Sequence, residues 1–298
     1  MSDQAHMRRL RLAQAHRPVF YLPHLVAAAI GAFARRSLEV EFVAMATSDQ
    51  WQILTSGTAD IAIGGPMRAM KLAEAGARVV TFCGAVAGSP WVVIGPSPSR
   101  VTDVRDVMGT EVLDDAEIAT ARLCLRGLLA LRGDTPQSLV LTELPTGELM
   151  RRLSAAKFEL ALVPLEKIVD LVGREEVYVL ASVGTWTGPV PWSAYQTLPE
   201  TLVTRRPELT AFVGAIGEAL EAIHGEAVSE LARWVGNELP AVSPYLLEAS
   251  IAGYRRMGVW AATPQIPSGD FDRFARILLA SGWLTRVPDR AALLVQAT

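Results

Sequence analysis

The residues best suited to hold a small molecule are a pair of glycines and an arginine. The segment Gly64-Gly65-Pro66-Met67-Arg68 follows a short apolar stretch, Ala59 to Ile63. Paired glycines let a ligand approach the backbone, and Pro66 suits the first turn of a helix. Arg68 can then hold a carboxylate through two nitrogens, the alternative being a solvated arginine on the helix surface. This segment predicts a ligand-contacting turn.

Two further groups of polar residues follow expected strands. They are Tyr21, Pro23 and His24 in the first group, and Ser48, Asp49 and Gln50 in the second. The first group would form an aromatic and polar wall where a strand ends, or would simply be packed and hydrogen-bonded in place. The second group begins a helix, whose free N–H groups can bind an anion or serve only as a cap. Because Asp49 competes for the same N–H groups, the pattern favours a neutral or zwitterionic ligand.

Five later residues complete the predicted binding site, and each has a plain structural alternative. They are Cys83, Asp115, Glu166, Trp186 and Trp192. The cysteine ends a strand expected to face the cleft, where it would be a ligand contact, a nucleophile or a small buried side chain. The acids would accept hydrogen bonds from a ligand amine or lie near helix starts. The tryptophans would stack on a flat ligand or pack at the hinge. No catalytic residue is assigned.

Composition excludes several classes of protein. The chain has 298 residues, a formal net charge of −3, two cysteines and four histidines. Such a charge provides no field for nucleic acid. The cysteines have neither metal-ligand spacing nor the number needed for a disulfide framework, and the histidines form no cluster with acids. We therefore expect no metal, no cofactor and no nucleic-acid partner.

The candidate residues must be positioned by strands and helices that alternate along the chain. This alternation predicts parallel strands with helices on both faces of a sheet. The turn-rich segment Gly95-Pro96-Ser97-Pro98-Ser99 predicts a first crossing between domains, and 185–191 a second. One lobe would then contain 1–95 and 190–298, and the inserted lobe 96–189. A ligand cleft is expected between them.

The amino end resembles a signal peptide only in part. Arginines precede an apolar stretch from Val19 to Ala34, but Pro23 and His24 interrupt it and Arg35 follows. The uninterrupted part is shorter than the ~20 residues that span a membrane. The chain as written is therefore expected in the cytoplasm, without a membrane span, and in the periplasm if a leader has been removed.

Several segments resemble the NMT1/THI5-like solute-binding proteins. They are Phe20-Tyr21-Leu22-Pro23, Leu38-Glu39-Val40-Glu41-Phe42, the stretch 54–64, the stretch 154–164, and Arg206-Pro207-Glu208-Leu209. That family includes the sulfonate, taurine, nitrate and formylaminopyrimidine receptors of ABC importers. The resemblance implies an α/β type II periplasmic-binding-protein fold, in which two α/β lobes joined by two hinge strands enclose a ligand.

The expected function is therefore binding of a small organic molecule for ABC-type uptake. Its ligand would be pyrimidine-like, sulfonate-like, amino-acid-like or an aromatic acid, and an ABC permease is a possible partner. The oligomeric state is left open. The alternative is a cytoplasmic, cofactor-independent enzyme on the same fold, such as a lyase, a desulfinase, a decarboxylase or an enzyme of thiamine-precursor synthesis. The desulfinase nucleophile is absent, since Tyr21 and Leu22 stand where that family has a cysteine.

Overall fold

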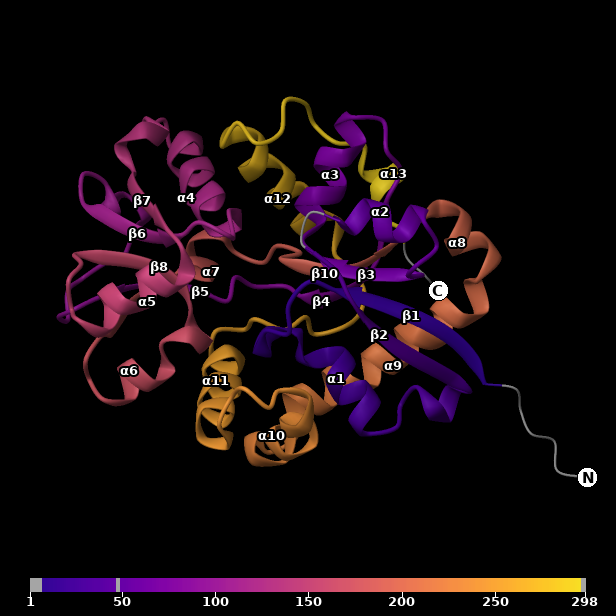
Figure 1. Cartoon of the computed structure of the whole chain (residues 1–298). Coiled ribbons are helices and arrows are strands. Elements are labelled where there is room, and N and C mark those ends of the chain that lie inside the picture. Colours follow the sequence, from indigo (N-terminus) through magenta and orange to yellow (C-terminus); the bar gives the residue numbers. More distant parts are fainter. Residues whose placement is uncertain (1–6, 47–48, 296–298) are drawn as a thin grey trace, which may run out of the picture.

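The computed structural model describes residues 7–46 and 49–295 and contains two five-stranded sheets. The first sheet has the order β2-β1-β3-β10-β4, and the second has the order β7-β6-β8-β5-β9. Figure 1 shows the two sheets side by side. The strands of the first are β1 (Arg8–Gln14), β2 (Leu38–Ala44), β3 (Ile61–Gly64), β4 (Val80–Val86) and β10 (Ser193–Thr197). Those of the second are β5 (Trp91–Gly95), β6 (Glu111–Asp115), β7 (Val140–Leu144), β8 (Leu160–Pro164) and β9 (Tyr178–Ser182).

Helices fill the connections, as the alternating pattern predicts. The amino-terminal part contains η1 (Val19–Tyr21), α1 (Leu22–Ala29), α2 (Gln50–Thr55) and α3 (Pro66–Glu74). The middle contains α4 (Thr120–Leu131), α5 (Thr146–Ser154), η6 (Leu165–Lys167), α6 (Val169–Gly173) and α7 (Val183–Thr187). The remainder contains α8 (Pro199–Thr204), α9 (Arg206–Gly225), α10 (Val228–Val235), α11 (Pro244–Arg256), α12 (Ser268–Ala280) and α13 (Arg290–Leu293). In Figure 1, α2 and α3 lie above the first sheet, and α1 and α10 lie below it.

The first sheet is mixed rather than all parallel. β1 pairs in parallel with β2 and with β3, as predicted. β10, however, is antiparallel to both β3 and β4. β10 ends at Thr197, because Pro199 begins α8 and removes a backbone donor. The chain therefore returns from the second sheet by inserting one reversed strand.

The predicted first crossing is misplaced by one strand. Trp91–Gly95 was expected to end the first lobe, but it pairs antiparallel with β8 and β9 in the second sheet. The chain thus leaves the first sheet between Val86 and Trp91, before the turn-rich segment that the prediction relied on. The return through Gly188 and Pro189 agrees with the expected second crossing. The assignment of 1–95, 96–189 and 190–298 to lobes otherwise stays a prediction.

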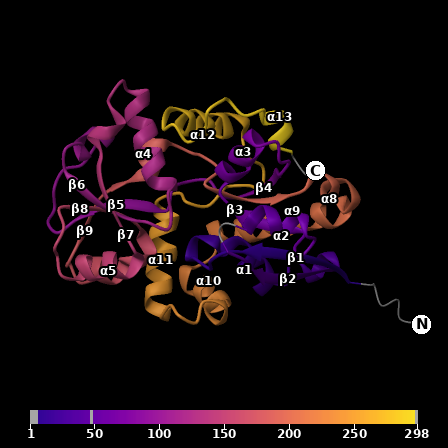
Figure 2. The same cartoon turned by 45° about the horizontal axis from the view of Figure 1, so that its top comes forward.

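The carboxyl-terminal helices contact both halves of the molecule. α12 lies across α4 and α3 in both views (Figures 1 and 2). A Cβ added at Gly127 in α4 would collide with the backbone of Ile277 in α12, so only glycine permits this close approach. On the other side, α11 packs against η6, where a Cβ at Gly253 would collide with Leu165. Helices α11 and α12 therefore hold the two halves of the molecule together.

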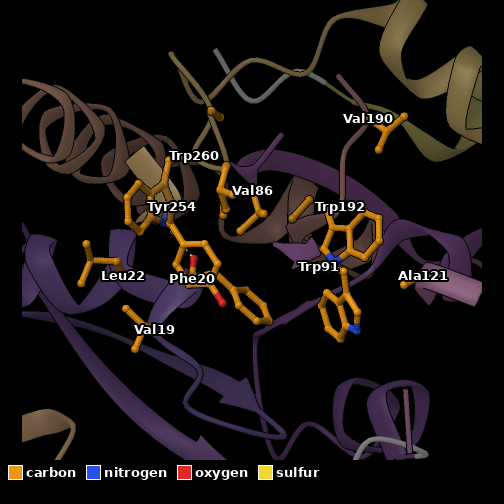
Figure 3. Close-up of a cluster of buried hydrophobic side chains, with 14 of the residues drawn as sticks. Val19, Phe20, Leu22, Val86, Trp91, Ala121, Val190, Trp192, Tyr254 and Trp260 are labelled. Atoms are coloured by element: carbon orange, nitrogen blue, oxygen red, sulfur yellow. Dashed lines mark hydrogen bonds between the residues drawn. The ribbon is translucent and has the colours of Figure 1, made fainter. Parts of the chain in front are cut away.

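One hydrophobic core continues from the first sheet into the second. Phe20, Trp91 and Trp192 are buried where the sheets meet, together with Tyr254 and Trp260 from the carboxyl-terminal part (Figure 3). The Nε1 of Trp260 donates a hydrogen bond to the carbonyl oxygen of Phe20 at 3.0 Å, which holds η1 against that part. Within the described residues, no helix combines the length and the apolar character that crossing a bilayer requires.

Candidate functional site

A cavity of about 80 Å³ lies where the two sheets face each other. The first sheet and its connections contribute Tyr21, Gln50, Gly64, Gly65, Met67, Arg68 and Ser193 to its lining. Trp91 begins the second sheet, Ile118 and Thr120 come from the start of α4, and Trp192 precedes β10. Larger hollows exist, such as one of about 310 Å³ beside the end of α3, but that hollow is formed by α3 and the carboxyl-terminal segment alone. Of these two cavities, only the smaller one is lined by residues from both halves of the molecule.

The paired glycines lie at the cavity because a buried strand ends there. Gly64 ends β3, and Gly65 immediately precedes the helix that Pro66 begins. A Cβ on Gly64 would lie 3.1 Å from the side-chain oxygen of Gln50, and one on Gly65 would lie 3.4 Å from the carbonyl oxygen of Trp192. Glycine therefore keeps the backbone close to its neighbours at this point.

A pair of buried glutamines fixes the end of β3 from two sides. The Nε2 of Gln50 donates to the Oε1 of Gln196 at 2.7 Å. The Nε2 of Gln196 in turn donates to the carbonyl oxygen of Gly64 at 3.1 Å. Gln50 is only 3% exposed, so these bonds take the place of water around its amide. This side of the cavity is thus rigidly held.

Tyr21 and Arg68 form the polar end of the cavity. Burial raises the pKa of the Tyr21 hydroxyl, against the opposing effects of a hydrogen bond with Ser193 and the charge of Arg68. Burial also lowers the pKa of the Arg68 guanidinium, while nearby Tyr21 raises it. Arginine nevertheless stays protonated at neutral pH, because its ordinary pKa lies far above 7. The cavity therefore holds a neutral phenol beside a positive charge.

Aromatic rings form another part of the lining. The rings of Trp91 and Trp192 lie 5.5 Å apart at 35°, and Phe20 lies 6.0 Å from Trp91 (Figure 3). Phe20 also meets Tyr21 edge to face at 5.0 Å. Met67 in α3 accepts a hydrogen bond from the hydroxyl of Thr120 at 3.3 Å, which links the two halves across the cavity. These aromatic rings suit an apolar or flat part of a ligand.

The described lining residues carry positive but no negative charge. Arg68 and the exposed His16 are the basic members. None of the described residues that line the cavity is an aspartate or a glutamate. Asp49, on which the expectation of a neutral ligand rested, begins α2 outside the lining and makes no side-chain cap. The expectation of a neutral or zwitterionic ligand, which depended on Asp49, therefore stays a prediction.

The structure brings seven of the predicted site residues to the cavity. They are Tyr21, Gln50, Gly64, Gly65, Met67, Arg68 and Trp192. Pro66 is buried beside them as the first residue of α3, without being part of the lining. Ser48 lies outside the described residues.

The first-lobe residues Pro23 and His24 are buried inside α1 rather than at the cavity. The ring nitrogens of His24 lie 3.2 Å from the hydroxyl of Tyr195 and 3.1 Å from the Oε1 of Gln14. Burial, with a smaller effect of the Arg17 charge, lowers the pKa of His24 to about 3. The imidazole is therefore neutral and is hydrogen-bonded within the core, which is the structural alternative given above for this histidine.

Cys83 does not end a strand at the cleft. It lies inside β4, which continues to Val86, and it is 0% exposed. Burial raises the pKa of its thiol well above the ordinary value. The thiolate, which is the nucleophilic form, is thereby disfavoured. Both the geometry and the direction of the shift oppose a nucleophilic role.

The second-lobe candidates serve the structure around the cavity. Asp115 accepts from the ammonium of Lys167 at 2.8 Å and from the hydroxyl of Thr146 at 2.9 Å. Glu166 accepts from the backbone N–H of Val19 at 2.6 Å, which joins η6 to η1. Trp186 in α7 donates to the carbonyl oxygen of Thr102 at 3.2 Å. Each acid is thus already engaged by a protein donor.

The sequence analysis missed ten lining residues, and Phe20, Trp91, Thr120 and Ser193 are the aromatic and hydroxyl-bearing ones among them. Phe20 precedes the predicted site residue Tyr21 in the sequence, and this position was the signal that could have identified it as a lining residue. Trp91 was placed in a strand of the other lobe, and Ser193 reaches the site only because β10 is inserted antiparallel. The described residues contain no group of three or more His, Cys, Asp or Glu side chains able to hold a metal ion.

Comparison with known proteins relates this architecture to solved structures. It matches the periplasmic aliphatic sulphonate binding protein SsuA from Escherichia coli with 15% identity and a TM-score of 0.76, covering 97% of this chain and 92% of that one. The alkanesulfonate-binding protein SsuA from Xanthomonas axonopodis pv. citri, bound to MOPS, matches with 14% identity and a TM-score of 0.73, over 97% and 98% of the chains. The ligand-binding component of an ABC-type import system from Staphylococcus aureus, with zinc bound, matches with 13% identity and a TM-score of 0.74, over 97% of each.

These similarities confirm the predicted type II periplasmic-binding-protein fold. None of the curated proteins compared matches this chain in sequence. The model of the family described as NMT1/THI5 like matches residues 20–224, which is more than half of the chain. The chain therefore belongs to the NMT1/THI5-like family.

Proposed function

We propose that this chain is a solute-binding protein that encloses a small organic anion between its two sheets. The observation that carries the proposal is a cavity whose described lining residues include Arg68 and several aromatic rings but no carboxylate. The acid group of the ligand would meet Arg68, Tyr21 and Ser193, and its body would pack against Trp192 and its neighbours. Sulfonates and carboxylates fit this pattern better than pyrimidines or amino acids do.

The known neighbours support this assignment without identifying the ligand. Two of them are described as sulfonate-binding proteins, and a third as the ligand-binding component of an ABC-type importer. We extend the proposal to delivery of the bound acid to an ABC permease, in the periplasm or on the outer side of the cytoplasmic membrane. Loss of uptake of that acid when the gene is deleted tests this step.

Binding is tested with paired acids and neutral analogues. We expect benzoate, benzenesulfonate or ethanesulfonate to raise the melting temperature, with benzamide and benzenesulfonamide having no effect. Isothermal titration calorimetry then gives the dissociation constant of the acid that binds. A panel in which only the neutral analogues bind would contradict an anion site.

The role of Arg68 is tested by Arg68→Gln. A hydrogen bond between charged partners contributes about 1.5–3 kcal/mol, so affinity for the acid should fall about 10- to 100-fold. Arg78→Gln is the matched control, because Arg78 is exposed and lies outside the cavity lining. Equal affinity in the two variants would contradict the assignment of Arg68. Mass spectrometry of the acid after incubation should recover it unchanged, since a product would favour the enzymatic alternative.

A further inference from the structure

Trp91 is held rigidly at the border between the two sheets. It is the first residue of β5, and its side chain is 1% exposed. Its backbone N–H donates to the hydroxyl of Ser89 at 3.2 Å. Its ring packs between Phe20 and Trp192 (Figure 3). The indole therefore has one orientation, and it is the aromatic side chain that the second sheet presents to the cavity.

The indole nitrogen of Trp91 is a buried donor without a hydrogen-bond partner among the described residues. Two other indoles are satisfied, since Trp260 donates to Phe20 and Trp186 donates to Thr102, whereas that of Trp283 shares the unpaired state of Trp91 within the described part of the chain. Leaving a buried N–H unpaired is unfavourable, because the group has lost water and gained nothing. In Figure 3 this nitrogen lies on the ring edge turned away from Phe20.

We propose that the indole N–H of Trp91 donates a hydrogen bond to an oxygen of the bound acid and is a specificity-determining group of the site. This inference rests on the proposed function of the cavity as an anion site. Arg68, Tyr21 and Ser193 would hold the ligand from the first sheet, and Trp91 would hold it from the second. A ligand would then satisfy donors on both sides of the cavity at once.

The chemistry of indole determines which ligands this position selects. Indole is a donor only, so it can pair with an oxygen acceptor but not with an N–H group of the ligand. A site built around a buried donor discriminates strongly against analogues that leave the donor unpaired. Carboxylates and sulfonates present several acceptor oxygens, whereas an amine or a methyl group at the same place presents none.

The test compares two conservative variants of the full chain. Trp91→Phe keeps an aromatic ring and removes the N–H. Trp283→Phe is the matched control, because the indole nitrogen of Trp283 is also buried without a partner, but Trp283 is not part of the cavity lining. The probe is whichever of benzoate, benzenesulfonate or ethanesulfonate binds the unmodified protein most tightly. Its dissociation constant is measured for all three proteins by calorimetry.

We expect Trp91→Phe to weaken binding of the probe about tenfold or more, and Trp283→Phe to leave it unchanged. In protein carrying ¹⁵N-labelled indole, the probe should move the Trp91 N–H resonance downfield, a change that loss of packing alone would not produce. The resonance is assigned by its absence from Trp91→Phe, and circular dichroism confirms that both variants are folded.

Two results would overturn the inference while leaving the anion site intact. One is equal affinity of Trp91→Phe and the unmodified protein for the probe. The other is a Trp91 N–H resonance that stays in place when the protein is saturated with the probe. Failure of every acid to bind the unmodified protein would instead overturn the proposed function, and this inference with it.

Discussion

Glu166 makes the stability of this fold depend on pH in a direction that the structure predicts. Its carboxylate accepts the N–H of Val19 at 2.6 Å, and its own backbone N–H donates to the hydroxyl of Tyr254 at 3.2 Å. Burial raises the pKa of this carboxyl to about 7, against the smaller effects of the Val19 N–H and the charge of Lys167. The ammonium of Lys167 is itself bonded to Asp115. The carboxyl is thus partly buried beside dipoles rather than paired with a cation.

The direction of the pH effect follows from comparing the pKa of Glu166 in the folded protein with its pKa in the unfolded chain. The ordinary pKa of a glutamate is 4.5 and the folded value is about 7, so the folded protein holds this proton more tightly than the unfolded chain does. Stability from this group is fully present below pH 4.5 and is lost as the pH rises through 7. A difference of this size corresponds to about 3 kcal/mol. The perturbation that removes it is Glu166→Gln, whose amide stays neutral and can still accept from Val19.

The assay is urea unfolding of both proteins at several pH values between 4.5 and 8.5. We expect the unmodified protein to lose about 3 kcal/mol more than Glu166→Gln across this range, with most of the change between pH 4.5 and 7. Asp114, whose pKa burial raises to about 6, titrates in the same range but is present in both proteins and cancels from the difference. A difference that does not vary with pH, or one of opposite sign, would refute the reasoning.

Two other substitutions test buried contacts outside the cavity lining. Gly127→Ala should destabilise the protein by about 2 kcal/mol, because the added methyl group meets the backbone of Ile277; Gly147→Ala, where the space is open, should have no such effect, and chemical unfolding of the two variants checks this. Lys167→Met should cost about 3 kcal/mol, because it leaves the buried Asp115 without its cation; loss of less than 1 kcal/mol in the same assay would show that Thr146 and the backbone N–H of Glu117 satisfy that carboxylate without Lys167.

Within the candidate site, local patterns predicted the features that a single segment produces. The end of a buried strand, two glycines and a helix-starting proline place Gly64, Gly65 and Arg68 at the cavity, and all of this is encoded in neighbouring residues. The prediction of Tyr21 likewise depended on its position after the first strand. Local patterns misled where a residue's role depends on its distant partner. Glu166 was predicted to contact a ligand. Its carboxylate instead accepts a hydrogen bond from the backbone N–H of Val19, which lies 147 residues away in the sequence.

The order of the strands explains the remaining differences. Trp91–Gly95 has an apolar pattern that suits either sheet, and only pairing with β8 and β9 places it in the second. The reversal of β10, which brings Ser193 to the cavity, likewise depends on β3 and β4 and not on its own residues.

The sequence by itself determined the alternation of strands and helices, the family and the glycine-rich turn, because propensity and spacing act over a few residues. The tertiary structure alone decided which strands are neighbours, which acids accept hydrogen bonds from protein donors, and that the indoles of Trp91 and Trp283 are buried without a partner among the described residues. Those outcomes depend on contacts between residues far apart in the chain, where each partner acquires its role from the other.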